Sequence, residues 1–157
     1  MGRSGRVCLP ALLTVVSGLA AIAIGLLVKL PFPLRSDIAK PVGYTILGVG
    51  MLLIAWSVLH IREAFLGEVE PRTDRLAQGG PYRFARHPVY LGMTIALVAV
   101  GVSMRSWLAV LAVFLLFLPG VVYRARLEEK ALAEKYGREW EDYAERTPFL
   151  LPFLKRR

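Results

Sequence analysis

The stretch PVYLGMTIALVAVGVSMRSWLAVLAVFLLFLPGVVY, residues 88–123, decides the fold. It holds 17 residues without charge or histidine from Pro88 to Met104, then Arg105, then 18 more from Ser106 to Tyr123. Each run is close to the roughly 20 residues that a helix needs to cross a hydrocarbon core of about 30 Å. Because one charged residue separates the runs, we expect two antiparallel membrane helices joined by a tight turn, with Trp107 anchored at the interface.

Two more apolar runs precede this hairpin, and 55% of the chain is hydrophobic, which is high for a soluble domain. Val7–Val28 contains 22 uncharged residues and Pro41–Leu59 contains 19. The first run follows two arginines as a signal peptide would, but its length is that of a spanning helix. We therefore predict an all-α integral membrane protein, a single domain over 1–157. Its transmembrane helices, about four in number, are expected near 8–29, 41–61, 88–104 and 106–123.

The cations of the chain fall mostly on one side of these spans. Sixteen of the 20 Lys and Arg residues lie before the first span, in the loop of about 62–87 with its immediate flank, or after residue 123. The positive-inside rule places both termini and this loop in the cytoplasm, and the small size suits a bacterial inner membrane. The net charge of +8 then indicates attraction to anionic membrane lipids. Neither nucleic acid nor a metal is expected as a partner.

A dense polar cassette, GGPYRFARHPVYLGM (residues 79–93), directly abuts the third apolar run. Pro88 suits the first position of a helix, which places His87 at the helix N-terminus. Free backbone N–H groups there favour an anion such as a carboxylate or phosphate. Tyr82 and Tyr90 can stack on a ring or close over a cation, and Gly92 permits close approach of a ligand or a neighbouring helix. Alternatively, the cations are membrane anchors and the tyrosines an aromatic belt.

A second polar stretch, YRARLEEKALAEKYGREWEDYAERTPF (residues 123–149), follows the fourth apolar run and predicts a cytoplasmic helix over about 124–145. Arg124 and Glu128 are four residues apart and share a helix face. They form either a weak ion pair of about 0.2–0.5 kcal/mol or a site in which Glu128 meets a ligand ammonium. The remaining acidic residues are interpreted as surface charges, His60 as a simple helix end, and the final TPFLLPFLKRR as lying at the membrane surface; the acidic residues are Glu129, Glu134, Glu139, Glu141 and Asp142.

Together, the two stretches suggest a zwitterionic ligand. They also resemble a known family: GPYRFARHPVYLG (80–92) followed by RARLEEKALAEKYGREWEDYAERTPFLLP (124–152) is similar to the isoprenylcysteine carboxyl methyltransferases and their phospholipid methyltransferase relatives. The resemblance covers about 74–153, and the first two spans match only as generic membrane helices. It implies S-adenosylmethionine as cofactor, bound by motifs in about 74–92 and 124–153. The residues implied as its contacts are Tyr82, His87, Pro88, Val89, Tyr90, Glu128, Asp74, Arg75, Leu76 and Ala77.

The same resemblance implies that Arg124 faces the acceptor substrate. Asp74 departs from the eukaryotic enzymes, which carry histidine there. A carboxylate acceptor needs no general base, and Arg124 can orient it by a bidentate contact. We therefore expect carboxyl O-methylation of an isoprenylcysteine-like, lipid-tailed or prenylated acceptor. Phospholipid N-methylation of the phosphatidylethanolamine type and a non-catalytic protein that binds anionic lipid remain as alternatives.

Overall fold

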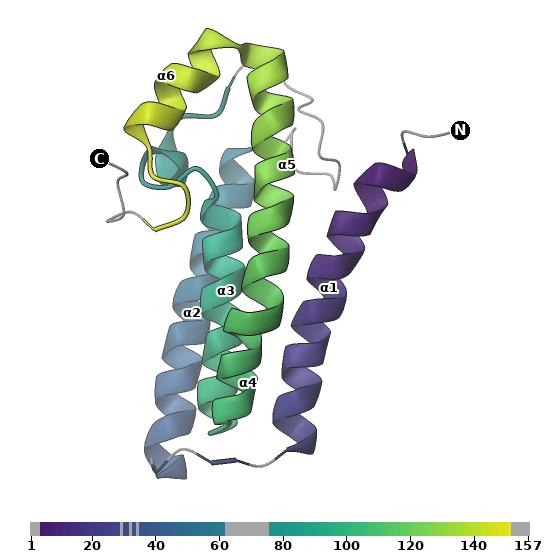
Figure 1. Cartoon of the computed structure of the whole chain (residues 1–157). Helices are drawn as coiled ribbons and strands as arrows, with labels where there is room; N and C mark the ends of the chain where they lie inside the picture. The colour runs from purple at the N-terminus through teal and green to yellow at the C-terminus, as the bar shows by residue number, and fades with distance from the viewer. Residues whose placement is uncertain (1–3, 29, 32, 34, 62–75, 152–157) are drawn as a thin grey trace.

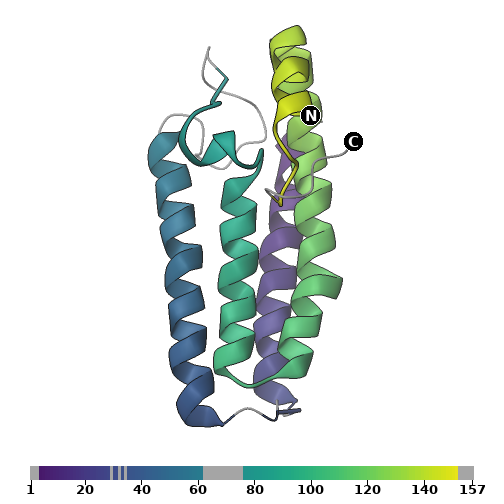
Figure 2. The same cartoon turned by 90° about the vertical axis from the view of Figure 1, so that its left-hand side faces the viewer.

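Long helices run side by side and carry shorter helices at one end (Figures 1 and 2). The structure, a computed structural model, describes residues 4–28, 30, 31, 33, 35–61 and 76–151. Their helices are α1 (Ser4–Leu27), α2 (Ser36–His60), the 3-10 helix η1 (Gly80–Arg83), α3 (Pro88–Ser103), α4 (Trp107–Ala112), the π-helical turn η2 (Val113–Phe117), α5 (Leu118–Tyr136) and α6 (Arg138–Arg146). The predicted all-helical fold is confirmed for these residues, whose one β contact is an isolated bridge.

Within the described residues, three helices are long and apolar enough to cross a membrane: Leu9–Leu27, Ser36–His60 and Trp107–Tyr136. Their large hydrophobic side chains are widely exposed, for example Leu27 and Leu52, as expected of a surface that meets lipid. Helix α3, over the run predicted as a fourth span, is apolar but has only 16 residues. That α3 crosses the membrane stays a prediction, and so does the cytoplasmic location of both termini.

Several helix boundaries differ from those predicted from the sequence. Helix α1 covers Ser4–Leu27, and α2 begins at Ser36, before the predicted start at 41, because Asp37 suits the positive end of the helix dipole. The separate charged helix predicted over 124–145 is wrong. Instead, α4, η2 and α5 form one continuous rod to Tyr136, Gly137 breaks it at a φ of +52°, and α6 follows.

The predicted tight turn between the last two apolar helices is confirmed. Arg105 adopts a φ of +56°, and the Ser106 side chain caps α4 by accepting a hydrogen bond from the Ala109 N–H at 3.1 Å. The Trp107 N–H donates to the Leu30 carbonyl at 3.1 Å, so the α1–α2 connection is tied to this turn. Trp107 itself is half exposed, as an interfacial anchor would be. Both short connections lie at the end opposite α6 (Figure 1).

Helices α2 and α3 approach closely where glycines face the partner backbone. A Cβ atom built on Gly50 would lie 2.9 Å from the Ala96 nitrogen and 2.9 Å from the Gly92 carbonyl oxygen. A Cβ on Gly92 would lie 2.7 Å from Ile54 Cγ1. The close approach of a neighbouring helix that was predicted at Gly92 is therefore confirmed, and α3, which carries the polar cassette at its start, is held firmly against α2.

We expect Gly50→Ala to destabilise the protein by about 1–3 kcal/mol, because the new methyl group meets backbone atoms that cannot move alone. Gly48→Ala is the matched control on the same helix, since nothing lies within 4 Å of its added Cβ. It should leave stability unchanged or raise it by up to about 1 kcal/mol. Thermal unfolding of both variants in detergent micelles tests this, and equal melting temperatures would contradict the proposed packing.

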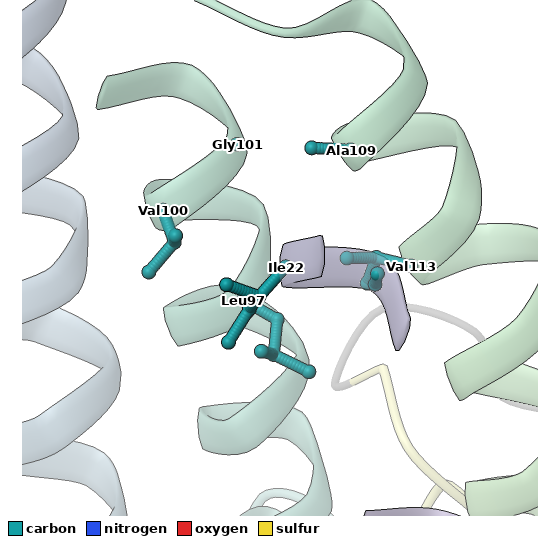
Figure 3. A pocket seen from close by; sticks show the side chains of 7 residues that line it. Ile22, Leu97, Val100, Gly101, Ala109 and Val113 are labelled. Carbon is teal, nitrogen blue, oxygen red and sulfur yellow. The ribbon is translucent and has the colours of Figure 1, made fainter. Parts of the chain in front are cut away.

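A small pocket lies between α1, α3 and α4, away from the cassette (Figure 3). Its lining is wholly apolar: Ala21, Ile22, Leu97, Val100, Gly101, Ala109 and Val113. Val113 begins the π-helical turn of the rod, and Pro119, which lacks an N–H, follows that turn closely. The core continues toward the cassette through Phe117, Val121 and Tyr90, so the rod and α3 share one packed interface.

Candidate functional site

The polar cassette forms the start of α3 and the short helix before it. Pro88 occupies the first position of α3 and His87 immediately precedes it, as predicted. The first intrahelical bond runs from the Leu91 N–H to the His87 carbonyl at 3.1 Å, which leaves the N–H groups of Val89 and Tyr90 ahead of the helical ladder. His87, Pro88, Val89 and Tyr90 are all buried.

Glu128, on α5, reaches this helix start and meets two other predicted site residues. Its Oε1 atom accepts hydrogen bonds from the Tyr90 hydroxyl and from Arg124 Nε, the latter at 3.3 Å. The Arg124 guanidinium also lies 5.8 Å from the centre of the Tyr90 ring. Glu128 Oε2 faces His87 Nδ1 at 3.8 Å, too far for a hydrogen bond, so this oxygen keeps acceptor capacity. The predicted shared face of Arg124 and Glu128 is therefore confirmed, and it points toward the cassette.

Glu129 is the main residue that the sequence analysis misplaced. Its interpretation as a surface charge is wrong, because its side chain is 11% exposed and lies against the cassette. Glu129 Oε1 is 2.6 Å from Arg86 Nη1 and 3.3 Å from His87 Nε2. The sequence held one signal for this contact: two consecutive glutamates next to a helix start that carries an arginine and a histidine.

The C-terminal part of the chain folds back over the cassette and forms its outer wall. The Tyr143 hydroxyl on α6 donates to the Tyr82 carbonyl at 2.7 Å, and the Arg86 N–H donates to the Pro148 carbonyl at 2.9 Å. The Phe149 ring meets the His87 ring edge-on, with 5.0 Å between ring centres. Pro148 and Phe149, in the stretch predicted to lie at the membrane surface, thus pack on the site. Residues 152–157 lie outside the described part of the chain.

Two further interpretations are confirmed, and both residues also make contacts between elements. His60 is the last residue of α2, as predicted, and its ring stacks on Tyr82 with 6.4 Å between ring centres and an interplanar angle of 23°. Glu139 is exposed, as a surface charge is, and it accepts a hydrogen bond from Gln78 at 3.1 Å. These contacts tie the end of α2 to the cassette and α6 to the segment that leads into it.

The hydroxyls of the buried residues Tyr82 and Tyr143 are held neutral. Burial raises the pKa of the Tyr82 hydroxyl well above its ordinary value, and the nearby Tyr143 and Glu128 raise it further. Burial also raises the pKa of the Tyr143 hydroxyl, although the positive charge of Arg86 opposes this. Both hydroxyls therefore act as neutral hydrogen-bonding groups at any ordinary pH.

The remaining predicted contacts fall into two groups. Leu76 and Ala77 are described and partly buried, in the irregular segment before η1. Asp74 and Arg75 lie outside the described residues. The structure thus brings together His87, Tyr90, Arg124 and Glu128, whereas Tyr82 is held to α6 through its carbonyl.

Comparison with known proteins gives the family of the chain. The profile of the phospholipid methyltransferase family matches residues 38–139, which include α2 from its third residue, the cassette and all of α5. The chain belongs to this family. The resemblance found from the motifs is confirmed, and the family match begins earlier in the chain, at α2 rather than at residue 74.

Relatives of this phospholipid methyltransferase family member carry several names. It is 33% identical over 115 residues to the nickel-cobalt-cadmium resistance protein NccN of Alcaligenes xylosoxydans xylosoxydans, covering 71% of this chain and 47% of the relative. It is 26% identical over 115 residues to protein-S-isoprenylcysteine O-methyltransferase B of Arabidopsis thaliana, covering 71% and 58%. It is 33% identical over 74 residues to methanethiol S-methyltransferase 1 of Bradyrhizobium diazoefficiens, covering 47% and 25%. The chain spans about half the length of the curated relatives it matches.

Proposed function

We propose that this protein is a membrane methyltransferase that binds S-adenosylmethionine at the cassette and methylates a carboxylate of an amphiphilic, lipid-like acceptor. One observation carries the proposal: the Glu128 carboxylate has one oxygen held by Tyr90 and Arg124, while the other keeps acceptor capacity beside His87. Family membership and the methyltransferase names of two relatives support the reaction class.

The residues at the site fit a zwitterionic cofactor. Glu128 Oε2 can accept from an ammonium, and its side chain is 22% exposed, so a ligand can reach it. The N–H groups of Val89 and Tyr90 at the start of α3 suit a carboxylate. Arg86 Nε, in the same cassette, is buried and has no hydrogen-bond partner among the described residues. The ring faces of Tyr90 and Tyr82 suit an aromatic base or a cation.

S-adenosylmethionine supplies a methyl group on a positively charged sulfonium, which is already activated for transfer. The protein therefore has to position the acceptor and exclude competing groups. Arg124 uses Nε for Glu128, which leaves its two terminal NH₂ groups as donors for an acceptor carboxylate. The acceptor carboxylate is already ionised near pH 7 and needs no general base.

The position of the site explains why this chemistry belongs in a membrane. The cassette abuts the apolar helix α3, and the neighbouring rod exposes Phe114, Leu115 and Leu116 toward the surroundings. A lipid-tailed acceptor can approach from the bilayer while the polar cofactor arrives from the cytoplasm. We propose that α3 completes a fourth span, that residues 1–157 form one domain, and that the site faces the cytoplasm of a bacterial inner membrane.

N-methylation of a phospholipid amine is the second candidate, and the family match itself favours it, because that family is described as phospholipid methyltransferases. On this alternative, Arg124 would hold the lipid phosphate while the amine reacts. An amine must be deprotonated before it can accept a methyl group, however, and the positive charge of a neighbouring arginine does not help to bind the amine itself. The carboxylate therefore remains the preferred acceptor.

A labelling experiment separates the two candidates. Purified protein in detergent is incubated with methyl-labelled S-adenosylmethionine and, in parallel, a prenylcysteine analogue, a phospholipid mixture or a total lipid extract. We expect label in the prenylcysteine analogue that is released by mild base, as a methyl ester is. Base-stable label in lipid amines would support the second candidate, and no incorporation above the Glu128→Gln variant would contradict both.

A further inference from the structure

Glu129 lies at the centre of a network that no ligand contact explains. Its carboxylate faces Arg86 and His87, which belong to the cassette. The side chains of Glu129, Arg86 and His87 are 11%, 17% and 6% exposed. The 2.6 Å contact to Arg86 Nη1 is an ion pair between two largely buried groups. Glu129 directly follows Glu128 on α5, yet it contacts Arg86 and His87 instead of facing Tyr90 and Arg124.

We propose that Glu129 is a positioning residue that fixes the orientation and tautomer of His87 and anchors Arg86. A carboxylate can only accept, so the 3.3 Å contact requires that His87 Nε2 carries the proton. A neutral ring protonated at Nε2 has a bare lone pair at Nδ1, which faces Glu128 Oε2 at 3.8 Å. Glu129 thereby turns His87 into a second acceptor next to Glu128.

Two acceptors this close need a donor between them. A cationic N–H group, such as the ammonium assigned to Glu128 above, would satisfy His87 Nδ1 and Glu128 Oε2 together. This last step rests on the proposed function, whereas the tautomer and the anchoring of Arg86 do not. The Tyr90 ring stacks beside the imidazole, with 5.7 Å between ring centres, and the Phe149 edge on another side limits rotation of the ring.

Arg86 extends the influence of Glu129 to the C-terminal wall. Its guanidinium carbon lies 5.5 Å from the Phe149 ring centre and 6.0 Å from the Trp140 ring centre. Its backbone N–H also donates to the Pro148 carbonyl. Because one carboxylate holds this guanidinium, Glu129 links α5 both to the start of α3 and to the segment that covers it.

The chain makes the tautomer directly measurable, since it contains only two histidines. Long-range ¹H–¹⁵N spectra of ¹⁵N-histidine-labelled protein in micelles give the protonated nitrogen of each ring, and the spectrum of His60→Gln identifies the His87 signals. We expect His87 protonated at Nε2 alone in the parent, and a mixture of tautomers in Glu129→Ala. Glu134→Gln, an exposed change on the same helix, should leave the signals as in the parent. A parent ring protonated at Nδ1 or at both nitrogens, or no response to Glu129→Ala, would overturn the proposal.

Binding and stability complete the test. Glu129→Gln should weaken S-adenosylmethionine binding about tenfold, because the charge that orders Arg86 is lost while an acceptor for His87 remains. It should also lower the melting temperature, since the buried Arg86 charge loses its partner, and Arg86→Met/Glu129→Gln should recover it. Recovery of both stability and parent affinity in the double variant would refute positioning through Arg86. If the parent binds no S-adenosylmethionine, the proposed function fails, and the tautomer of His87 still decides the role of Glu129.

Discussion

Replacing Glu128 with glutamine should weaken S-adenosylmethionine binding at least about thirtyfold, the largest effect on cofactor binding that we expect of a single change. Removing one partner of a desolvated charge pair costs about 2–5 kcal/mol. The glutamine amide keeps an oxygen that can accept from Tyr90 and Arg124, so the hydrogen bonds of Glu128 Oε1 are preserved. Its NH₂ group, however, replaces Oε2 and donates toward His87 Nδ1, where it takes the place of the ligand ammonium.

Equilibrium dialysis or calorimetry with purified protein in detergent gives the dissociation constants. Glu134→Gln is the matched control, because it removes the same charge from an exposed position six residues further along α5. It should bind as the parent does. If Glu128→Gln binds with parent affinity and an unchanged melting temperature, the ammonium site is elsewhere and the cassette loses its assigned role.

Features that depend on neighbours in sequence were predictable. Pro88 fixes the start of α3, and the lone charge of Arg105 between two apolar runs fixes the tight turn. The spacing of Arg124 and Glu128 places them on one face of any continuous helix, and they do interact. Each of these follows from one element at a time, and each is confirmed.

Contacts between elements were not predictable in the same way. The π-helical turn at Val113–Phe117 accommodates one extra residue in the rod, and a single residue rotates everything after it by about 100°. The apolar pattern of the rod therefore does not decide which face of α5 meets α3. Glu129 was assigned to solvent for this reason, although it meets Arg86, 43 positions earlier in the chain.

The segment formed by α6 and residues 147–151 shows a second limit of prediction from the sequence. Gly137 was available as a helix-ending signal, but the charged pattern on both sides of it suggested one continuous helix over 124–145. At a φ of +52° the chain turns back, and α6 with residues 147–151 then reaches the cassette. Burial of Trp140, Tyr143 and Thr147 stabilises this return, and such burial depends on elements distant in sequence.

Replacing Arg124 with glutamine should reduce turnover of a carboxylate acceptor about 100-fold while leaving S-adenosylmethionine affinity unchanged or greater. The sign follows from charge. Arg124 is a cation beside Glu128, so its removal leaves that carboxylate more attractive to a cationic ligand. The acceptor, in contrast, loses a charge-assisted partner worth about 1.5–3 kcal/mol. Turnover by Arg124→Lys should fall between that of the parent and that of Arg124→Gln, because lysine keeps the charge but not the planar guanidinium.

Steady-state kinetics with the prenylcysteine analogue and direct binding of the cofactor are measured on the same preparations. Arg138→Gln, an exposed change of equal charge on α6, serves as the control and should match the parent in both. If turnover and cofactor affinity fall together in Arg124→Gln, then Arg124 acts by holding Glu128 and Tyr90 in place, not by binding the acceptor. If turnover on lipid amines survives while turnover on carboxylates is lost, one site serves both acceptors and the arginine alone selects the acid.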